Sequence, residues 1–333
     1  MIVTLTEGVD AGIVRDALAA LGLWTSPFEG RRGSLQLYVH SHSGEVNRDA
    51  LLRVPGVADV SEPASRHPRV DELSAGIEIG GVEIGGEADP VLMAGPCSVE
   101  SEHGIHEAAE RVARLGARFL RGGAYKPRTS PYDFQGVGTS ALRWLRQAAD
   151  ANDLLVVTEA LSESSVDAVA EVADLVQIGS RNMHNGALLD AAGRSGRPVL
   201  VKRGMAATVE EWLSAAEYCL AGGAPSVLFC ERGIRSFDDR TRNLLDLGSV
   251  ALLRHVYGLP VIVDPSHGLG RRDLIPHLSR AAIAAGAAGL LIEVHQEPGQ
   301  AMSDGPQALT FEEIESLASE LRESLPFAVP LTG

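Results

Sequence analysis

Lysine is nearly absent from this chain, and the two positions that keep it share a context. Of the 29 basic residues, 27 are arginine, and only Lys126 and Lys202 are lysine. Lys126 ends the run that begins at Phe119, and Lys202 ends the apolar run that begins at Pro198. The lysine ammonium is a compact point charge that approaches an anion without the planar fork of arginine. Two lysines that both follow predicted strands therefore indicate one shared anion site.

Other ionisable side chains also stand at the ends of predicted strands. In chain order, these are Cys97, Arg121, Glu159, Arg181, Arg203, Arg232, His267 and Glu293. In a protein with a net charge of −15, converging cations predict a small substrate with several negative charges, such as phosphates and carboxylates. Cations that only cap helices or face solvent would explain one or two of these residues. The acidic balance also argues against general nucleic-acid binding.

A second set of residues, Cys97, His267, Glu293 and Asp304, predicts a metal site. Their spacing forms no local motif, but closure of a barrel would pair the last strand with the first and bring the four side chains together. Thiolate, imidazole and carboxylate ligands suit Mn²⁺, Fe²⁺, Co²⁺ or Zn²⁺ better than Mg²⁺ or Ca²⁺. Taken singly, a cysteine such as Cys97 is more often a small buried residue than a ligand, and a lone His267 also fits a hydrogen-bonded core or catalytic imidazole.

Strand and helix signals alternate from Val91 onward, as the positioning of these side chains requires. Eight apolar runs predict strands, and Ala/Leu-rich amphipathic stretches such as 107–115, 142–151 and 210–220 follow them. Near-continuous apolar strands indicate a parallel sheet covered on its outer face. Eight such units match a (β/α)₈ TIM barrel, whose active site lies at the C-terminal ends of the strands. The alternative is a doubly wound sheet, but Gly95-Pro-Cys-Ser is not a dinucleotide-binding turn. The predicted strands span 91–94, 119–121, 154–158, 175–178, 199–201, 226–230, 261–263 and 289–292.

The first part of the chain has a different order of strand and helix signals. Strand and helix signals over residues 2–61 follow a βαββαβ order, which predicts a small ferredoxin-like domain. The alternating segment 77–84, divided by Gly80-Gly81, predicts a β-hairpin. We therefore expect a ferredoxin-like domain over 1–66, a linker with the hairpin over 67–88, and the catalytic barrel over 89–330.

Composition places the chain among soluble globular proteins, with 45% hydrophobic and 22% charged residues. The sequence contains no apolar stretch long enough to span a membrane and no signal-peptide pattern at its start. Three widely spaced cysteines argue against a disulfide framework and for a reducing cytoplasm. We expect a cytoplasmic protein that binds neither membrane nor nucleic acid.

Several independent motifs occur in one order along the barrel: 93–101 (MAGPCSVES), 120–130 (LRGGAYKPRTS), 177–182 (QIGSRN), 201–205 (VKRGM), 230–233 (CERG), 264–267 (DPSH), 292–295 (IEVH) and 303–305 (SDG). Together they resemble the 3-deoxy-D-arabino-heptulosonate 7-phosphate (DAHP) synthase family, in its short type I subgroup with an N-terminal ferredoxin-like domain. This family condenses phosphoenolpyruvate with erythrose 4-phosphate, the first step of the shikimate pathway to aromatic amino acids.

The resemblance implies roles for individual residues. Phosphoenolpyruvate would be held by Arg121, Lys126, Arg181, Lys202 and Arg232, with backbone amides near Gly179 and Ser180. The phosphate of erythrose 4-phosphate would be held by Arg128 and Thr129. One divalent transition metal ion would be bound by Cys97, His267, Glu293 and Asp304, and Asp304 would also face the substrate. Lys126 is a candidate proton donor, Glu159 a candidate base for water, and His267 a further catalytic candidate.

Two alternatives remain at this point. A related family, 3-deoxy-D-manno-octulosonate 8-phosphate synthase, resembles Lys-Ala-Asn-Arg-Ser where this chain has Lys126-Pro-Arg-Thr129, which favours erythrose 4-phosphate. A non-catalytic, metabolite-sensing barrel would not need the complete set of cations and metal ligands.

The resemblance further implies a homotetramer whose first domain binds tyrosine or phenylalanine as a feedback inhibitor. A first domain that only stabilises the oligomer is the simpler interpretation.

Overall fold

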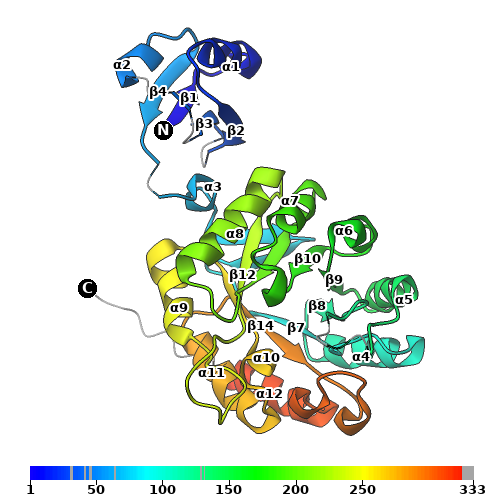
Figure 1. Ribbon diagram of the computed structural model, residues 1–333. Coiled ribbons are helices and arrows are strands. Elements are labelled where there is room, and N and C mark those ends of the chain that lie inside the picture. The colour runs from blue at the N-terminus through cyan, green and yellow to red at the C-terminus, as the bar shows by residue number, and fades with distance from the viewer. Residues whose placement is uncertain are drawn as a thin grey trace. The chain divides into compact units, whose positions relative to one another are not determined.

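The chain separates into two compact units, Met1–Ser74 and Ala75–Gly333 (Figure 1). The computed structural model describes residues 1–30, 33–40, 43–44, 47–63, 65–127, 130 and 132–324.

The first unit is built on a four-stranded antiparallel sheet with the strand order β2-β3-β1-β4. Alternate strand residues such as Val3 and Leu37 are fully buried against Val14 and Leu18 of α1, so the core lies on one face of the sheet. This order and the βαββαβ succession are those of a ferredoxin-like domain, as the sequence predicted. The elements are β1 (Ile2–Leu5), α1 (Ala11–Ala20), β2 (Thr25–Glu29), β3 (Leu35–Val39), α2 (Arg48–Leu51), β4 (Val57–Ser61) and the short α3 (Pro68–Asp71).

The second unit contains a closed barrel of eight parallel strands, and the TIM-barrel prediction is confirmed. Closure comes from β14, which pairs with β7 so that Glu293 lies opposite Gly95. Four strands extend one or two residues beyond the predicted apolar runs and take in a charged residue near their C-terminal ends, namely Glu159, Lys202, Glu231 and Glu293. The apolar pattern could not include these charged residues. The strands are β7 (Val91–Gly95), β8 (Phe119–Arg121), β9 (Leu155–Ala160), β10 (Leu175–Ile178), β11 (Val199–Lys202), β12 (Val227–Glu231), β13 (Val261–Val263) and β14 (Gly289–Glu293).

Helices surround the ring of strands (Figure 1). The helix α8 shows how the sequence sets their ends: Thr208 and Glu211 form a capping box, and Gly223 ends the helix in the left-handed conformation. None of the described helices is long and apolar enough to cross a lipid bilayer. The helices are α4 (Glu102–Arg114), α5 (Thr139–Asp150), α6 (Glu163–Ala170), α7 (Gly186–Arg194), α8 (Val209–Gly222), α9 (Leu247–Ala251), α10 (Pro265–Leu269), α11 (Ile275–Ala284) and α12 (Phe311–Ser324).

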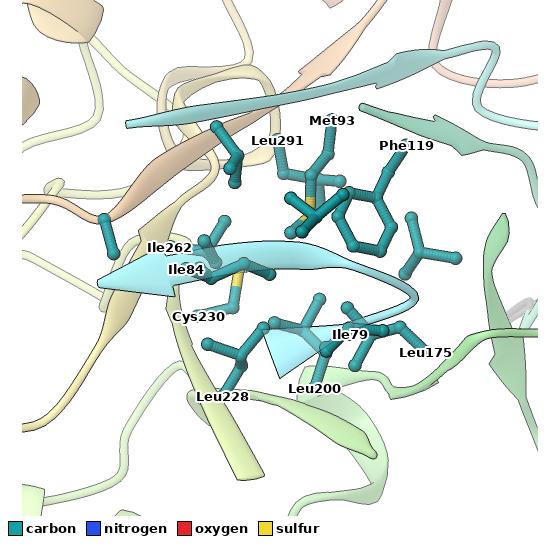
Figure 2. Packing of buried hydrophobic residues seen from close by; sticks show 14 of the residues in the cluster. Ile79, Ile84, Met93, Phe119, Leu175, Leu200, Leu228, Cys230, Ile262 and Leu291 are labelled. Atoms are coloured by element: carbon teal, nitrogen blue, oxygen red, sulfur yellow. The ribbon is translucent and has the colours of Figure 1, made fainter. Parts of the chain in front are cut away.

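A two-stranded hairpin, β5 (Gly76–Ile79) and β6 (Val82–Gly85), fills one end of the barrel. Figure 2 shows Ile79 and Ile84 of the hairpin among Met93, Phe119, Leu175 and other residues from the strands. Many of these partners stand at the start of their strands, so the hairpin closes the N-terminal end. Glu78 and Glu83, on the other face of the hairpin, are exposed. Apolar side chains thus fill the barrel at its N-terminal end, and the polar side chains gather at the C-terminal end.

We expect Ile84→Ala to destabilise the protein by about 2–5 kcal/mol, because Ile84 is fully buried and its loss leaves a cavity under the barrel. The change is measured as a shift of the urea unfolding midpoint. Glu83→Ala is the matched control on the exposed face, where a change within about 0.5 kcal/mol is expected. Equal shifts for the two variants would contradict a packing role for the hairpin.

Candidate active site

Four potential ligand atoms gather at the C-terminal end of the barrel. They belong to Cys97, His267, Glu293 and Asp304, and all lie within 4.8 Å of one another. Cys97 follows β7, His267 lies in α10 after β13, and Glu293 is the last residue of β14. Asp304 precedes the 3₁₀ turn η5 (Gly305–Gln307) in the segment between β14 and α12. Barrel closure therefore brings these four distant residues together, as the sequence predicted.

Local backbone geometry places the first of these side chains. Gly95 has a φ of +152°, and a Cβ on it would lie 2.0 Å from the carbonyl oxygen of Arg121. Only glycine fits at this point, and it allows the chain carrying Cys97 to leave β7 close against β8. The ligand His267 is placed by the start of α10. Asp264, the N-cap residue of this helix, accepts a hydrogen bond from the backbone N of His267 (2.9 Å).

A buried carboxylate orients the imidazole. Asp264 Oδ2 lies 2.7 Å from His267 Nδ1, which leaves Nε2 directed toward Glu293 Oε1 at 3.1 Å. Burial lowers the pKa of His267, so its ring is neutral at neutral pH and can act as a ligand. Burial opposes the charge of Asp264, but His267 and Lys202 hold its pKa well below the usual range. This carboxylate–histidine arrangement is typical of metal sites.

The thiol of Cys97 also fits a metal site. Burial, with help from Glu293, raises the pKa of Cys97 to about 12, whereas Lys126 opposes the shift. Lys126 Nζ lies 2.8 Å from the sulfur. A coordinated divalent cation would deprotonate such a thiol and favour the anionic oxygen ligands beside it. One soft thiolate, one imidazole and two carboxylates therefore form a coherent donor set for a transition metal ion.

A strongly cationic pocket lies beside the four ligands. Arg232 is 5% exposed, and its Nη1 has no hydrogen-bond partner among the described residues. Burial lowers the pKa of Arg232, and a buried guanidinium nitrogen without a partner calls for an anion. Arg181 is exposed at the rim. The pocket is lined by Lys126, Pro127, Asp133, Glu159, Gly179, Ser180, Arg181, Lys202, Met205, Arg232, Arg242, His267 and Asp304.

Glu159 stands within this pocket on β9. Its Oε2 accepts a hydrogen bond from Gln177 Nε2 at 3.1 Å. A Cβ on Gly179 would come within 2.1 Å of Glu159 Oε1, so the glycine leaves space for the carboxylate. Glu159 is therefore a carboxylate that faces the pocket beside the start of η1 (Ser180–Asn182).

The remaining predicted residues do not all reach the pocket. Arg121 does not line the pocket; it is 5% exposed, and its Nη1 binds Glu293 Oε1 at 2.7 Å. Arg203, which the strand-end pattern placed in the site, turns away to Glu231 and Asp246 and stacks near Trp212. Adjacent residues at a strand end face opposite sides, so Lys202 and Arg203 cannot both enter the pocket. Arg128 and Thr129 lie outside the described residues.

Three further residues belong to the site although the sequence analysis gave them no role. Asp264 stands three residues before His267, a spacing that allows a helix-capping carboxylate to bind the ring, and this signal was available. Gln307 Nε2 donates to Glu293 Oε2 at 2.5 Å. Arg242 reaches the pocket from the long segment between β12 and α9. Neither Gln307 nor Arg242 occupies a strand end, so no periodic signal marks them.

Comparison with known proteins gives consistent matches. The profile of the DAHP synthetase I family matches residues 63–326. A phospho-2-dehydro-3-deoxyheptonate aldolase from Thermotoga maritima is 51% identical over 247 residues, which cover 74% of this chain and 73% of that protein. A 2-dehydro-3-deoxyphosphooctonate aldolase from Acidithiobacillus ferrooxidans is 35% identical over 256 residues, 71% of this chain and 90% of that one.

Solved structures agree with these matches. The crystal structure of a Thermotoga maritima phospho-2-dehydro-3-deoxyheptonate aldolase (DAHP synthase) superposes with a TM-score of 0.75 and 42% identity, covering 97% of this chain and 96% of that one. A truncated form of the 3-deoxy-D-arabino-heptulosonate 7-phosphate synthase from Thermotoga maritima gives a TM-score of 0.70 and 47% identity, over 75% and 91% of the two chains.

We expect Co²⁺ added to the protein to produce a thiolate-to-metal absorption band, because Cys97 lies among the other three ligands. Cys97→Ser should abolish that band and weaken Co²⁺ binding by about 10-fold or more, measured by optical titration. Cys219→Ala is the control, since Cys219 is buried within α8. A band that survives in Cys97→Ser and disappears in Cys219→Ala would place the metal elsewhere.

Proposed function

The chain belongs to the DAHP synthetase I family, and we infer that it is a DAHP synthase, which condenses phosphoenolpyruvate, erythrose 4-phosphate and water to DAHP and phosphate. The observation that carries this inference is one pocket that joins four potential metal ligands to several cations, among them the buried Arg232, whose Nη1 has no partner among the described residues. Such a pocket suits one substrate with a phosphate and a carboxylate and another whose carbonyl oxygen needs a Lewis acid.

The related octulosonate activity is less well supported. The 2-dehydro-3-deoxyphosphooctonate aldolases are 35% identical or less, against 51% for the heptonate aldolase. The segment Lys126-Pro-Arg-Thr129 also resembles the heptulosonate enzymes. A barrel that only senses a metabolite would have no use for the complete ligand set.

We propose that phosphoenolpyruvate binds against Lys202, Arg232 and Arg181, with the amides near Gly179 and Ser180. Arg232 supports this placement because its buried Nη1 has no protein partner among the described residues. Lys202 is 4% exposed and is held by Asp264 at 2.5 Å. Its ammonium therefore reaches the pocket as a fixed point charge. Arg121 pairs with Glu293 and neutralises its charge. Arg128 and Thr129 would bind the phosphate of erythrose 4-phosphate.

One divalent ion held by Cys97, His267, Glu293 and Asp304 would supply Lewis-acid polarisation of the aldehyde, and Mn²⁺, Fe²⁺, Co²⁺ or Zn²⁺ suits these ligands. Lys126 is our candidate proton donor. Burial opposes its charge, but Cys97, Glu293 and Glu159 raise its pKa, so it carries a proton at neutral pH. As C3 of phosphoenolpyruvate attacks the aldehyde carbon, the aldehyde oxygen becomes basic and can accept that proton.

Glu159 is our candidate base for the second half of the reaction. Positive charge that develops at C2 of phosphoenolpyruvate is quenched by water, and the resulting phosphohemiketal loses phosphate by cleavage of its C–O bond. Glu159 faces the pocket close to Gly179, where it can accept the proton of the attacking water. The cations that held the substrate then hold the departing phosphate.

The division of the chain suggests a separate role for its first part. We propose that residues 1–66 form a regulatory domain, joined by 67–88 to a catalytic barrel over 89–330, in a cytoplasmic homotetramer that tyrosine or phenylalanine inhibits. In support, the first unit is compact by itself and has its own hydrophobic core, which includes Val3, Leu18 and Leu37. All three cysteines are free, as expected in a reducing compartment.

We expect EDTA treatment to abolish DAHP formation from phosphoenolpyruvate and erythrose 4-phosphate, and Mn²⁺ or Co²⁺ to restore it, because the carbonyl needs a Lewis acid. Product is measured after periodate oxidation. Arabinose 5-phosphate is the control substrate and should give a much lower kcat/KM. Unchanged activity in EDTA would refute the metal requirement, and no product with any divalent ion would favour the sensing barrel.

Titration of tyrosine and phenylalanine into the same assay tests the first domain. Full-length protein should lose activity with one of them, and a truncated chain that begins at Gly76 should keep its activity. Tryptophan serves as the unmatched aromatic control. Equal inhibition of both forms would exclude the first domain as the sensor, and no inhibition of either would favour a purely stabilising role.

A further inference from the structure

Three of the four potential metal ligands, Cys97, Glu293 and Asp304, each contact a cation. Lys126 Nζ lies 2.8 Å from Cys97 Sγ, Arg121 Nη1 lies 2.7 Å from Glu293 Oε1, and Arg242 Nη1 lies 3.4 Å from Asp304 Oδ1. The neutral ligand His267 is joined to Lys202 through Asp264. Lys126, Arg121 and Lys202 already have proposed roles: Lys126 and Lys202 act at the substrate, and Arg121 neutralises Glu293. Arg242 is the fourth member of this pattern and has none.

Arg242 contacts a second ligand indirectly. The same Nη1 donates to Gln307 Oε1 at 2.8 Å, and Gln307 Nε2 donates to Glu293 Oε2 at 2.5 Å. Gln307 is 3% exposed, so this link lies inside the protein. The backbone N of Arg242 donates to Leu269 O at the end of α10. Arg242 therefore links α10, which carries His267, through its backbone N, and links the turn that carries Asp304 and Gln307 through its guanidinium.

Asp304 needs such support more than the other ligands do. Its side chain is 22% exposed, against 1% for Glu293, and its φ is +52°, in the left-handed region. The opposite side of its segment is fastened separately, because Glu100 Oε1 accepts from the backbone N of Met302 at 2.8 Å. Ser98 and Ser303 add a contact of 2.7 Å between their hydroxyl oxygens. These contacts fasten Met302 and Ser303, whereas Arg242 reaches the carboxylate of Asp304 itself.

We propose that Arg242 is a positioning residue of the metal centre, which orients Asp304 directly and Glu293 through Gln307. This inference rests on the proposed function for the identity of the four ligands. Partners beyond the ligands fix the direction of the coordinating oxygens, and their loss commonly weakens metal binding by about 10–100-fold. Arg242 is 39% exposed and also lines the pocket, so direct binding of substrate is the competing role.

The test uses the full-length, metal-free protein and the variants Arg242→Gln, Arg242→Lys and Arg240→Gln. Arg240 is exposed in the same segment and serves as the matched control. We expect Arg242→Gln to weaken Mn²⁺ binding about 10–100-fold, Arg242→Lys to recover part of this loss, and Arg240→Gln to bind as the wild type does. Free Mn²⁺ is measured by electron paramagnetic resonance. With Co²⁺, the thiolate band should persist while the d–d bands shift.

A second variant guards against a local folding defect. Gln307→Met removes the link to Glu293, and the losses in Arg242→Gln and Gln307→Met should not add in the double variant, because both break one chain of contacts. Unchanged Mn²⁺ affinity in Arg242→Gln, with or without a raised KM for either substrate, would overturn the proposal. Additive losses, or loss of the thiolate band, would overturn it as well.

Failure of this inference and failure of the proposed function have different signatures. The Mn²⁺ titration involves no substrate, so weaker binding in Arg242→Gln would stand even if the wild type formed no DAHP. Conversely, an active wild type with equal metal affinities across the variants would refute only the role of Arg242.

Discussion

The pairing of β14 with β7 is the constraint on which the site depends. This single ladder joins the last strand of the barrel to the first and sets Glu293 opposite Gly95. Cys97 then stands two residues beyond the paired glycine, and a ring without an open edge holds the register. Close approach of Arg121 to Gly95 leaves no space for a side chain there. A slip of the ladder by one residue would turn Glu293 out of the site and separate it from the thiol.

Charge is the second organising element, and it follows from that closure. A carboxylate, a thiol and several cations are buried together, which would be very unfavourable for any of them alone. Interlocked pairing makes the arrangement tolerable: Arg121 with Glu293, Lys126 with Cys97, and Lys202 with Asp264. Because Lys126 and Lys202 line the pocket and also pair with this buried group, a bound ion and an anionic substrate would act on the same side chains.

The periodicity of the strands in the sequence was sufficient to predict the residues at the strand ends. Residues at strand ends, such as Cys97, Lys202 and Glu293, were found because the parallel topology sends them to one edge. Arg203 was misplaced because alternation along the strand turns it to Glu231 instead. Arg242 and Gln307 could not be predicted, since their positions depend on how irregular segments fold back over the barrel. The roles assigned to the site residues stay predictions, and those of Arg128 and Thr129 fall outside the described structure.

The hairpin of β5 and β6 has a kinetic consequence. Ile79 and Ile84 pack among residues from the starts of the strands, so these described side chains fill the barrel core at that end. Both reactants must arrive, and both products must depart, through the same mouth. A molecule seated deeply among Lys202 and Arg232 would be obstructed by whatever lies above it. Turnover is then expected to follow a compulsory sequence of arrival and departure, in which the deeper reactant enters first.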